Sequence, residues 1–236
     1  MHTTAIILAG GKGTRMNTDI PKQYIQVDDK PILYYTIRAF EESNVDDIVI
    51  VTGDSVIYGA SEHTYCDQII SEAGFAKVRA YADGGKERYN SVMNGMEKVN
   101  PHTDIVLVHD GARPCIEPDY INICIDDTVK YGSSVMAVPS KDTIKIVDCD
   151  GNVVDTPDRN TLWMIQTPQG FMYQELKNAY NKLKNDKNTD LNITDDAMVM
   201  ENFGTRKPHI SRGLYTNIKV TTKEDLKILK FFLKKC

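Results

Sequence analysis

A glycine-rich loop near the start of the chain has the composition of a phosphate-binding site. It reads LAGGKGTRM from Leu8 to Met16 and follows a short run of apolar residues. Glycine lets backbone N–H groups approach an anion closely, and Lys12, Arg15 and the nearby Lys22 supply positive charge. The loop therefore predicts a site for phosphate oxygens, although a plain turn with solvated bases would explain the glycines alone.

Two familiar nucleotide-binding motifs do not fit this loop. A P-loop requires Ser or Thr directly after its lysine, and here Gly13 follows Lys12. The dinucleotide motif of a Rossmann domain requires a third glycine where Met16 stands. Asp54 is the only acidic candidate near the end of the second predicted strand that could bind a ribose. A nicotinamide-dependent oxidoreductase is therefore disfavoured.

A second glycine-containing segment, GGKERYNS, runs from Gly84 to Ser91 into a predicted helix. Backbone donors at a helix start, together with Arg88 and Ser91, could contact a base edge or a hydroxyl. The same pattern is also what an ordinary helix start looks like, so the segment alone is a weak indication of a binding site.

The segment LVHDGARP places Asp110 and Arg113 just beyond a predicted strand. Asp110 is suited to hold Mg²⁺ beside a triphosphate, and Arg113 could steady it or a substrate oxygen. The alternative is an Asp–Arg pair that only braces the loop. His109 is expected to pack as a strand residue, because no second His or Cys lies at metal-ligand spacing.

Apolar strands must position these segments. Short β-branched runs alternate with helical patterns through residue 138, and the strands are expected at 4–9, 47–52, 77–81 and 104–109. This alternation predicts a layered α/β fold with a largely parallel central sheet. Ligands bind outside the carboxyl ends of such strands, so the site is expected in the loops after Leu8, His109 and Pro139.

The alternation stops in residues 139–168, which contain two apolar runs around an Asp150-Gly151 turn and the only tryptophan, Trp163. This pattern predicts a β-hairpin that projects as an arm from a single domain spanning 1–236. Two helices and a C-terminal helix then follow, with an extended segment at 217–220 before the last. Thr194-Asp195-Asp196 is interpreted as an ordinary helix N-cap.

Composition narrows the class of protein. Of the 236 residues, 41% are hydrophobic and 26% charged, as in a globular protein, and the net charge of −5 disfavours a nucleic-acid partner. No apolar stretch could span a membrane and no signal-peptide pattern is visible, so we expect a cytoplasmic protein. The five cysteines lack a C-x-x-C pair, which disfavours a disulfide framework or zinc site.

Together and in this order, the motifs resemble the 2-C-methyl-D-erythritol 4-phosphate cytidylyltransferases of the non-mevalonate isoprenoid pathway. The HDGARP block is specific to this family and its near relatives, whereas the first block is shared by many sugar-nucleotide transferases. The matching blocks span nearly the whole chain: AGGKGTRM from Ala9, PKQ from Pro21, GGKER from Gly84, VHDGARP from Val108, KDT from Lys141, DRN from Asp158, QTPQ from Gln166, ITDD from Ile193 and NIKVT from Asn217.

The resemblance implies a fold and a reaction. The fold would be a three-layer α/β sandwich with a mostly parallel, mixed central sheet, like that of nucleotide-diphospho-sugar transferases, in a homodimer with interlocking β-hairpin arms. The reaction would use CTP and Mg²⁺ to transfer CMP to 2-C-methyl-D-erythritol 4-phosphate, a polyol phosphate, and release pyrophosphate. An ionised phosphate needs no general base, so positioning and charge stabilisation would suffice.

The resemblance also assigns residues. The catalytic cations would be Arg15, Lys22 and Lys219. Nucleotide-binding positions would be Ala9, Gly10, Gly11, Gly13, Thr14, Gly85, Arg88, Ser91 and Asp110, with Asp110 also at the metal. Substrate-binding positions would be Arg113, Thr143 and Arg159, the last two from the neighbouring subunit.

The nearest alternative is ribitol-5-phosphate cytidylyltransferase, used for wall or capsule polymers, which shares the fold, the arm and most blocks. The Gly111-Ala112 pair and the segments 155–159 and 193–196 favour the isoprenoid enzyme by resemblance. A non-catalytic nucleotide-binding module is disfavoured because it would have no use for so many phosphate-facing bases.

Overall fold

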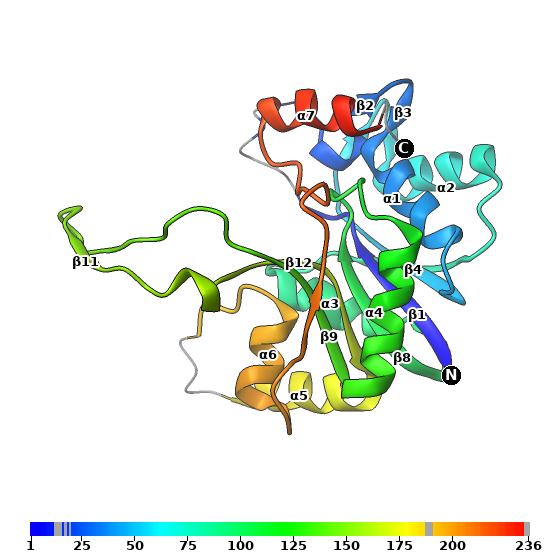
Figure 1. Ribbon diagram of the computed structural model, residues 1–236. Coiled ribbons are helices and arrows are strands. Elements are labelled where there is room, and N and C mark those ends of the chain that lie inside the picture. The colour runs from blue at the N-terminus through cyan, green and yellow to red at the C-terminus, as the bar shows by residue number, and fades with distance from the viewer. Residues whose placement is uncertain (12–15, 17, 19, 187–190, 234–236) are drawn as a thin grey trace.

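The computed structural model describes residues 1–11, 16, 18, 20–186 and 191–233, and its central feature is a seven-stranded sheet (Figure 1). The strand order is β13-β9-β12-β8-β1-β4-β7. Strand β12 is antiparallel to both neighbours, and the other pairings are parallel, so the predicted mostly parallel, mixed sheet is confirmed. The strands are β1 His2–Leu8, β4 Asp47–Thr52, β7 Val78–Asp83, β8 Thr103–Asp110, β9 Ser133–Pro139, β12 Trp163–Met172 and β13 Ile210–Arg212.

Helices cover both faces of the sheet because its strands carry apolar side chains on both faces. In β1, Ala5 and Ile7 pack into one buried cluster, whereas Ile6 packs into the other. The helices of the first layer are α1 Ile32–Glu41, α2 Glu62–Ala73 and α4 Pro118–Tyr131. Those of the second are α3 Arg88–Met96, α5 Tyr173–Asn185 and α6 Asp196–Phe203.

The last helix, α7 Lys223–Leu233, docks beside α1 through a third cluster in which Leu229 is fully buried. The extended segment before α7 is tied to the loop after β8, because the Val220 N–H donates to the Ala112 carbonyl over 2.9 Å. None of the described helices is both long and apolar enough to cross a membrane.

Short elements complete the described chain. Three two-stranded sheets lie outside the main sheet: β2 Gln26–Val27 with β3 Lys30–Pro31, β5 Val56–Ile57 with β6 Ala60–Ser61, and β10 Ile146–Val147 with β11 Val153–Asp155. Two short 3₁₀ turns are η2 Lys22–Tyr24 and η3 Arg159–Thr161. The β10–β11 hairpin extends far from the layered body (Figure 1).

The main sheet contains two strands beyond the four ranges expected from the sequence and the strand implied before the loop after Pro139. Residues 163–168, which the sequence places in the arm, begin β12, where they continue the pairing with β9. The β12 register shifts between Ile165 and Gln169, so its apolar residues do not alternate regularly. Strand β13 is only three residues long, too short for its pattern to be read.

Candidate active site

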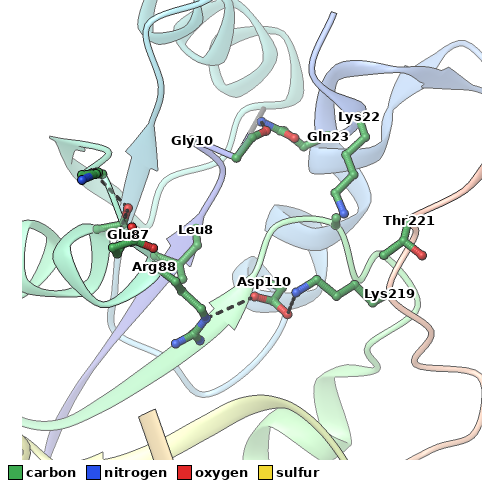
Figure 2. Close-up of a pocket in the computed structure, with 14 residues that line it drawn as sticks. Leu8, Gly10, Lys22, Gln23, Glu87, Arg88, Asp110, Lys219 and Thr221 are labelled. Carbon is green, nitrogen blue, oxygen red and sulfur yellow. Dashed lines mark hydrogen bonds and ion pairs between the residues drawn. The ribbon is translucent and has the colours of Figure 1, made fainter. Parts of the chain in front are cut away.

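A cavity of about 510 Å³ lies at the carboxyl ends of β1 and β8 (Figure 2). Parallel sheets place their ligands at this edge. The cavity is lined by Leu8, Gly10, Gly11, Lys22, Gln23, Gly85, Lys86, Glu87, Arg88, Ser91, Asp110, Ala112, Lys219 and Thr221. The three motifs found in the sequence therefore meet at one place, together with the NIKVT block.

The start of the glycine-rich loop is held tightly between neighbouring segments. A Cβ added to Gly10 would lie 3.0 Å from the carbonyl carbon of Thr52, so a larger residue would crowd this backbone. The buried side chain of Gln23 donates to the carbonyls of Ala9 and Gly11. These contacts fix the backbone that enters the cavity. The predicted residues Lys12, Gly13, Thr14 and Arg15 lie outside the described residues.

The second glycine segment forms the opposite wall. The Gly84 N–H donates to the Thr52 carbonyl over 2.7 Å, and the Gly85 N–H donates to Ser91 Oγ over 2.9 Å. Arg88 is the first residue of α3, so its side chain lies beside the start of the helix. Figure 2 shows Arg88 and Lys219 on either side of Asp110, with Lys22 pointing toward the same region from η2.

Asp110, the last residue of β8, is surrounded by cations. Its Oδ2 lies 2.9 Å from Lys219 Nζ and 3.4 Å from Arg113 Nε, and its Oδ1 lies 3.9 Å from Arg88 Nε. Burial alone would raise the pKa of this carboxyl, but Lys219, Arg88 and Arg113 outweigh it and hold the pKa well below its usual range. Asp110 is therefore ionised.

Arg113 is close to Asp110 but does not line the cavity. Its Nη1 donates to the Asn217 carbonyl over 2.9 Å, which joins the loop after β8 to the segment carrying Lys219. His109 is fully buried against Phe40, with its Nε2 3.3 Å from the Arg113 carbonyl. Burial lowers the pKa of His109 to about 3, so its ring is neutral. Its predicted role as a packed strand residue is confirmed.

The donors around the cavity fit a metal ion that arrives with a nucleotide. Within the described ranges, no group of three His, Cys, Asp or Glu side chains could hold a metal. Mg²⁺ is commonly bound by one or two carboxylates together with substrate phosphates, not by a cage of protein ligands. The single ionised carboxylate of Asp110, beside a phosphate-suited loop, matches that arrangement.

Asp196 is a residue of this site that the sequence does not reveal. Its Oδ2 lies 2.7 Å from Arg88 Nη1, and it has no exposed surface. The predicted helix N-cap is confirmed, but Asp195 forms it, accepting from the Met198 N–H over 3.0 Å. Asp196 belongs to the ITDD block of the family resemblance, but the helix-cap interpretation of that block does not predict its pair with Arg88. Gln23, Lys86 and Thr221 also line the cavity without having been predicted as site residues.

Thr143 and Arg159 are not brought to the cavity within one chain. Both lie in the projecting segment between β9 and β12, and both are exposed. Nη1 of Arg159 donates to the Lys141 carbonyl over 3.3 Å. Neither residue lines the cavity of its own chain.

A mixed α/β sheet with a glycine loop and converging cations at its carboxyl edge defines a nucleotidyltransferase of the nucleotide-diphospho-sugar transferase-like fold. The family model of 2-C-methyl-D-erythritol 4-phosphate cytidylyltransferases matches residues 3–235, and the chain belongs to this family. The predicted family, enzyme class and fold are thereby confirmed.

Individual relatives agree with the family model. The chain is 46% identical over 232 residues to 2-C-methyl-D-erythritol 4-phosphate cytidylyltransferase of Lachnospira eligens, covering 98% of this chain and 99% of the relative. It is similar to the crystal structure of 4-diphosphocytidyl-2C-methyl-D-erythritol synthase from Anaerococcus prevotii (TM-score 0.84, 30% identity, 99% and 96% coverage). It is also similar to the Francisella tularensis cytidylyltransferase (TM-score 0.75, 28% identity, 98% and 100% coverage).

Proposed function

We propose that this protein transfers CMP from CTP to 2-C-methyl-D-erythritol 4-phosphate, giving 4-diphosphocytidyl-2-C-methyl-D-erythritol and pyrophosphate. The observation that carries this proposal is the cavity itself, which Lys22, Arg88 and Lys219 line together with the ionised carboxylate of Asp110, beside a glycine loop. Such a site suits a triphosphate and a second phosphate, and membership of the cytidylyltransferase family supports the choice of both substrates.

In the proposed reaction, an oxygen of the substrate phosphate attacks the α-phosphorus of CTP in line. A new P–O bond forms as the bond from the α-phosphorus to the bridging oxygen of the β-phosphate breaks, and pyrophosphate leaves. The attacking phosphate is already ionised, so no base is required. Lys22 and Lys219 stabilise the charge that develops on the phosphoryl oxygens, and the loop at Gly10 and Gly11 positions the triphosphate.

The opposite wall would bind the nucleoside. The Gly85 backbone, Arg88 and Ser91 face the cavity at the start of α3 and are suited to contact the base and ribose. Asp110 would hold Mg²⁺, which supplies further charge neutralisation when it is bound with the triphosphate. Arg113 would act by bracing Asp110 and the Lys219 segment. Arg15, with Gly13 and Thr14, stays a prediction of the sequence.

The β-hairpin arm, which is predicted as residues 139–168 and projects between β9 and β12, would join two subunits into a homodimer. The side chains of its two strands are largely exposed, among them Val153 at 59% and Val154 at 65%. An isolated two-stranded hairpin is at best marginally stable in water, so these apolar residues need a partner surface. We propose that this surface is the arm of a second subunit in a two-fold symmetric contact, and that Thr143 and Arg159 then bind the polyol phosphate in the neighbour's cavity.

One assay tests the proposed function: pyrophosphate release from each nucleoside triphosphate with each polyol phosphate. Release that requires CTP and 2-C-methyl-D-erythritol 4-phosphate is the expected result. Release with ribitol 5-phosphate instead would support the alternative considered from the sequence, which family membership disfavours. No release with any pair would contradict the proposal. A cytoplasmic location stays a prediction of the sequence.

A further inference from the structure

Asp196 lies behind the cavity, forms a buried ion pair with Arg88 and has no role in the proposed reaction as written. Arg88 Nη1 lies 2.7 Å from Asp196 Oδ2, whereas Arg88 Nε lies 3.9 Å from Asp110 Oδ1. Asp196 has no exposed surface, while 22% of the Arg88 side chain is exposed and lines the cavity. Arg88 is therefore closer to Asp196, which does not line the cavity, than to Asp110, which does.

Tyr180 orients the Asp196 carboxylate. Its hydroxyl donates to Asp196 Oδ1 over 2.5 Å, which leaves Oδ2 to pair with Arg88. Tyr180 is itself buried on α5, in the apolar cluster that also contains residues of α6. A buried carboxylate is tolerated when it is both paired and hydrogen-bonded, as Asp196 is. The helix layer thus holds the Arg88 guanidinium in place from behind.

Asp110 is the second carboxylate that approaches Arg88, with its Oδ1 3.9 Å from Arg88 Nε. A planar guanidinium pairs strongly with a carboxylate through two parallel hydrogen bonds, and such a pair would occupy both oxygens of Asp110. In the observed arrangement Lys219 and Arg113 both approach Oδ2, and Arg88 stays 3.9 Å from Oδ1. The position of Arg88 thus decides whether Oδ1 is open to another cation.

We propose that Asp196, oriented by Tyr180, is a positioning residue that draws Arg88 away from Asp110 and keeps Asp110 Oδ1 available to a divalent cation carried by the nucleotide. The inference rests on the proposed function, in which Mg²⁺ and CTP meet at Asp110. Asp196 acts only through Arg88 and contacts neither.

The experiment measures how much Mg²⁺ strengthens CTP binding. Its readout is the Kd of CTP in EDTA divided by the Kd in saturating Mg²⁺, both from isothermal titration calorimetry. Asp196→Asn keeps the shape of the side chain and removes its charge. We expect the ratio to fall about tenfold, because Arg88 then pairs with Asp110, and coupling between contacting charged residues is of this size.

A matched control removes the same charge from the next residue. Asp195 caps α6 and accepts from Gln169 Nε2 over 2.8 Å, whereas the ion pairs of Arg88 with described residues are to Asp196 and Asp110. Asp195→Asn should leave the ratio at the wild-type value.

Adding Arg88→Met to Asp196→Asn should return the ratio toward wild type, because the guanidinium that would occupy Asp110 is gone. If Asp196 has only a structural role, adding Arg88→Met should not restore the ratio, even if the Kd of CTP changes.

An unchanged ratio in folded Asp196→Asn, or a fall that the double variant does not reverse, overturns the positioning role and leaves the proposed function intact. If Asp196→Asn does not fold, Tyr180→Phe takes its place, and a smaller fall in the same direction is expected. An unchanged ratio in folded Tyr180→Phe would then overturn the inference. If the wild-type protein does not bind CTP at all, the proposed function fails and the inference fails with it.

Discussion

Lys219 Nζ lies 2.9 Å from Asp110 Oδ2, although the two residues are far apart in the sequence. The contact forms because the segment carrying Lys219 is tied to the loop after β8 by two hydrogen bonds, Val220 N–H to the Ala112 carbonyl and Arg113 to the Asn217 carbonyl. A cation suited to phosphates, Lys219, and a carboxylate suited to a metal, Asp110, therefore lie next to each other at the cavity.

Asp110→Asn should keep the fold and lower kcat/KM by about 10²-fold, because removing one preorganised charge from a transition state has effects of this size. The Mg²⁺ concentration that gives half-maximal activity should rise, since an amide binds the ion more weakly than a carboxylate. A magnesium titration of pyrophosphate release measures both effects. The exposed Asp126 on α4 supplies the control, as Asp126→Asn, which should behave as wild type. An unchanged magnesium curve would leave Asp110 with a bracing role only.

Lys22→Ala should abolish most turnover without unfolding the protein. Lys22 lines the cavity from the short η2 turn, where it can meet charge that develops only in the transition state. Losing such a contact should lower kcat by about 10²–10³-fold, or about 3–4 kcal/mol. Circular dichroism and a urea titration check the fold, and steady-state kinetics give kcat. Near-wild-type kcat in a correctly folded variant would remove Lys22 from the mechanism.

The sequence predicts the edge of the sheet where the site lies but not all of its contacts. Asp110 could be singled out because an acidic residue after a buried strand has a known position in an α/β sheet. Lys219 could be named only through the family resemblance, because no local pattern tells which distant loop returns to the same edge. Asp196 lies in the ITDD block of the resemblance, but the sequence predicts only a helix cap there, because it does not show that the carboxylate is buried against Arg88.

The sequence predicts the β10–β11 hairpin for a different reason. Two apolar runs around a D-G turn form a local pattern, and the β10–β11 hairpin contains both flanking segments. The sequence does not predict strand β12, because its pairing with β9 and β8 is non-local and its register shift hides the alternation. Local sequence periodicity therefore predicts hairpins, whose two strands are close in the sequence. It does not predict strands whose pairing partners are distant in the sequence.

Glu62→Gln should weaken both the fold and nucleotide binding. The buried Glu62 accepts from the Gly53 N–H over 2.7 Å and from the Tyr24 hydroxyl over 3.0 Å, and Gly53 lies against Gly10. Losing a charge-assisted hydrogen bond there should lower the free energy of unfolding by about 2 kcal/mol. The Kd of CTP should rise, because the glycine loop loses support. Glu72→Gln, at an exposed site on the same helix, should change neither quantity.

His109 should make stability depend on pH in the apo protein. Burial lowers its pKa to about 3, so between that value and the usual pKa of about 6.5 the unfolded chain binds a proton that the folded chain does not. Stability is then fully present above pH 6.5 and is lost as the pH falls. The contribution is about 2 kcal/mol between pH 6.5 and pH 5.

Urea titrations in EDTA at several pH values measure this effect. His109→Asn should be less stable than wild type at pH 7.5, because packing against Phe40 is lost, but should show a smaller decline toward pH 5. His63→Asn is the control, since the His63 side chain is 53% exposed and should not alter the slope. An equal decline in His109→Asn and wild type would show that His109 does not cause it.

The shared-site proposal predicts complementation between two inactive variants. In a homodimer with arms exchanged, a heterodimer of Arg159→Ala and Lys22→Ala subunits holds one site with both defects and one site with neither. Random mixing should therefore restore up to about a quarter of wild-type activity, because half of the dimers are mixed and each has one complete site. Pyrophosphate release after subunit exchange measures the recovery.

The control for this experiment pairs two defects that belong to the same chain's cavity. Lys22 and Asp110 both line it, so every dimer formed from Lys22→Ala and Asp110→Asn subunits has two defective sites and should stay inactive. Native mass spectrometry shows whether subunits exchange. If mixed dimers of Arg159→Ala and Lys22→Ala form and the mixture stays inactive, Arg159 does not act in the neighbour's cavity. Because Arg159 lies on the projecting arm, a monomeric variant should also be inactive even though its own cavity is complete.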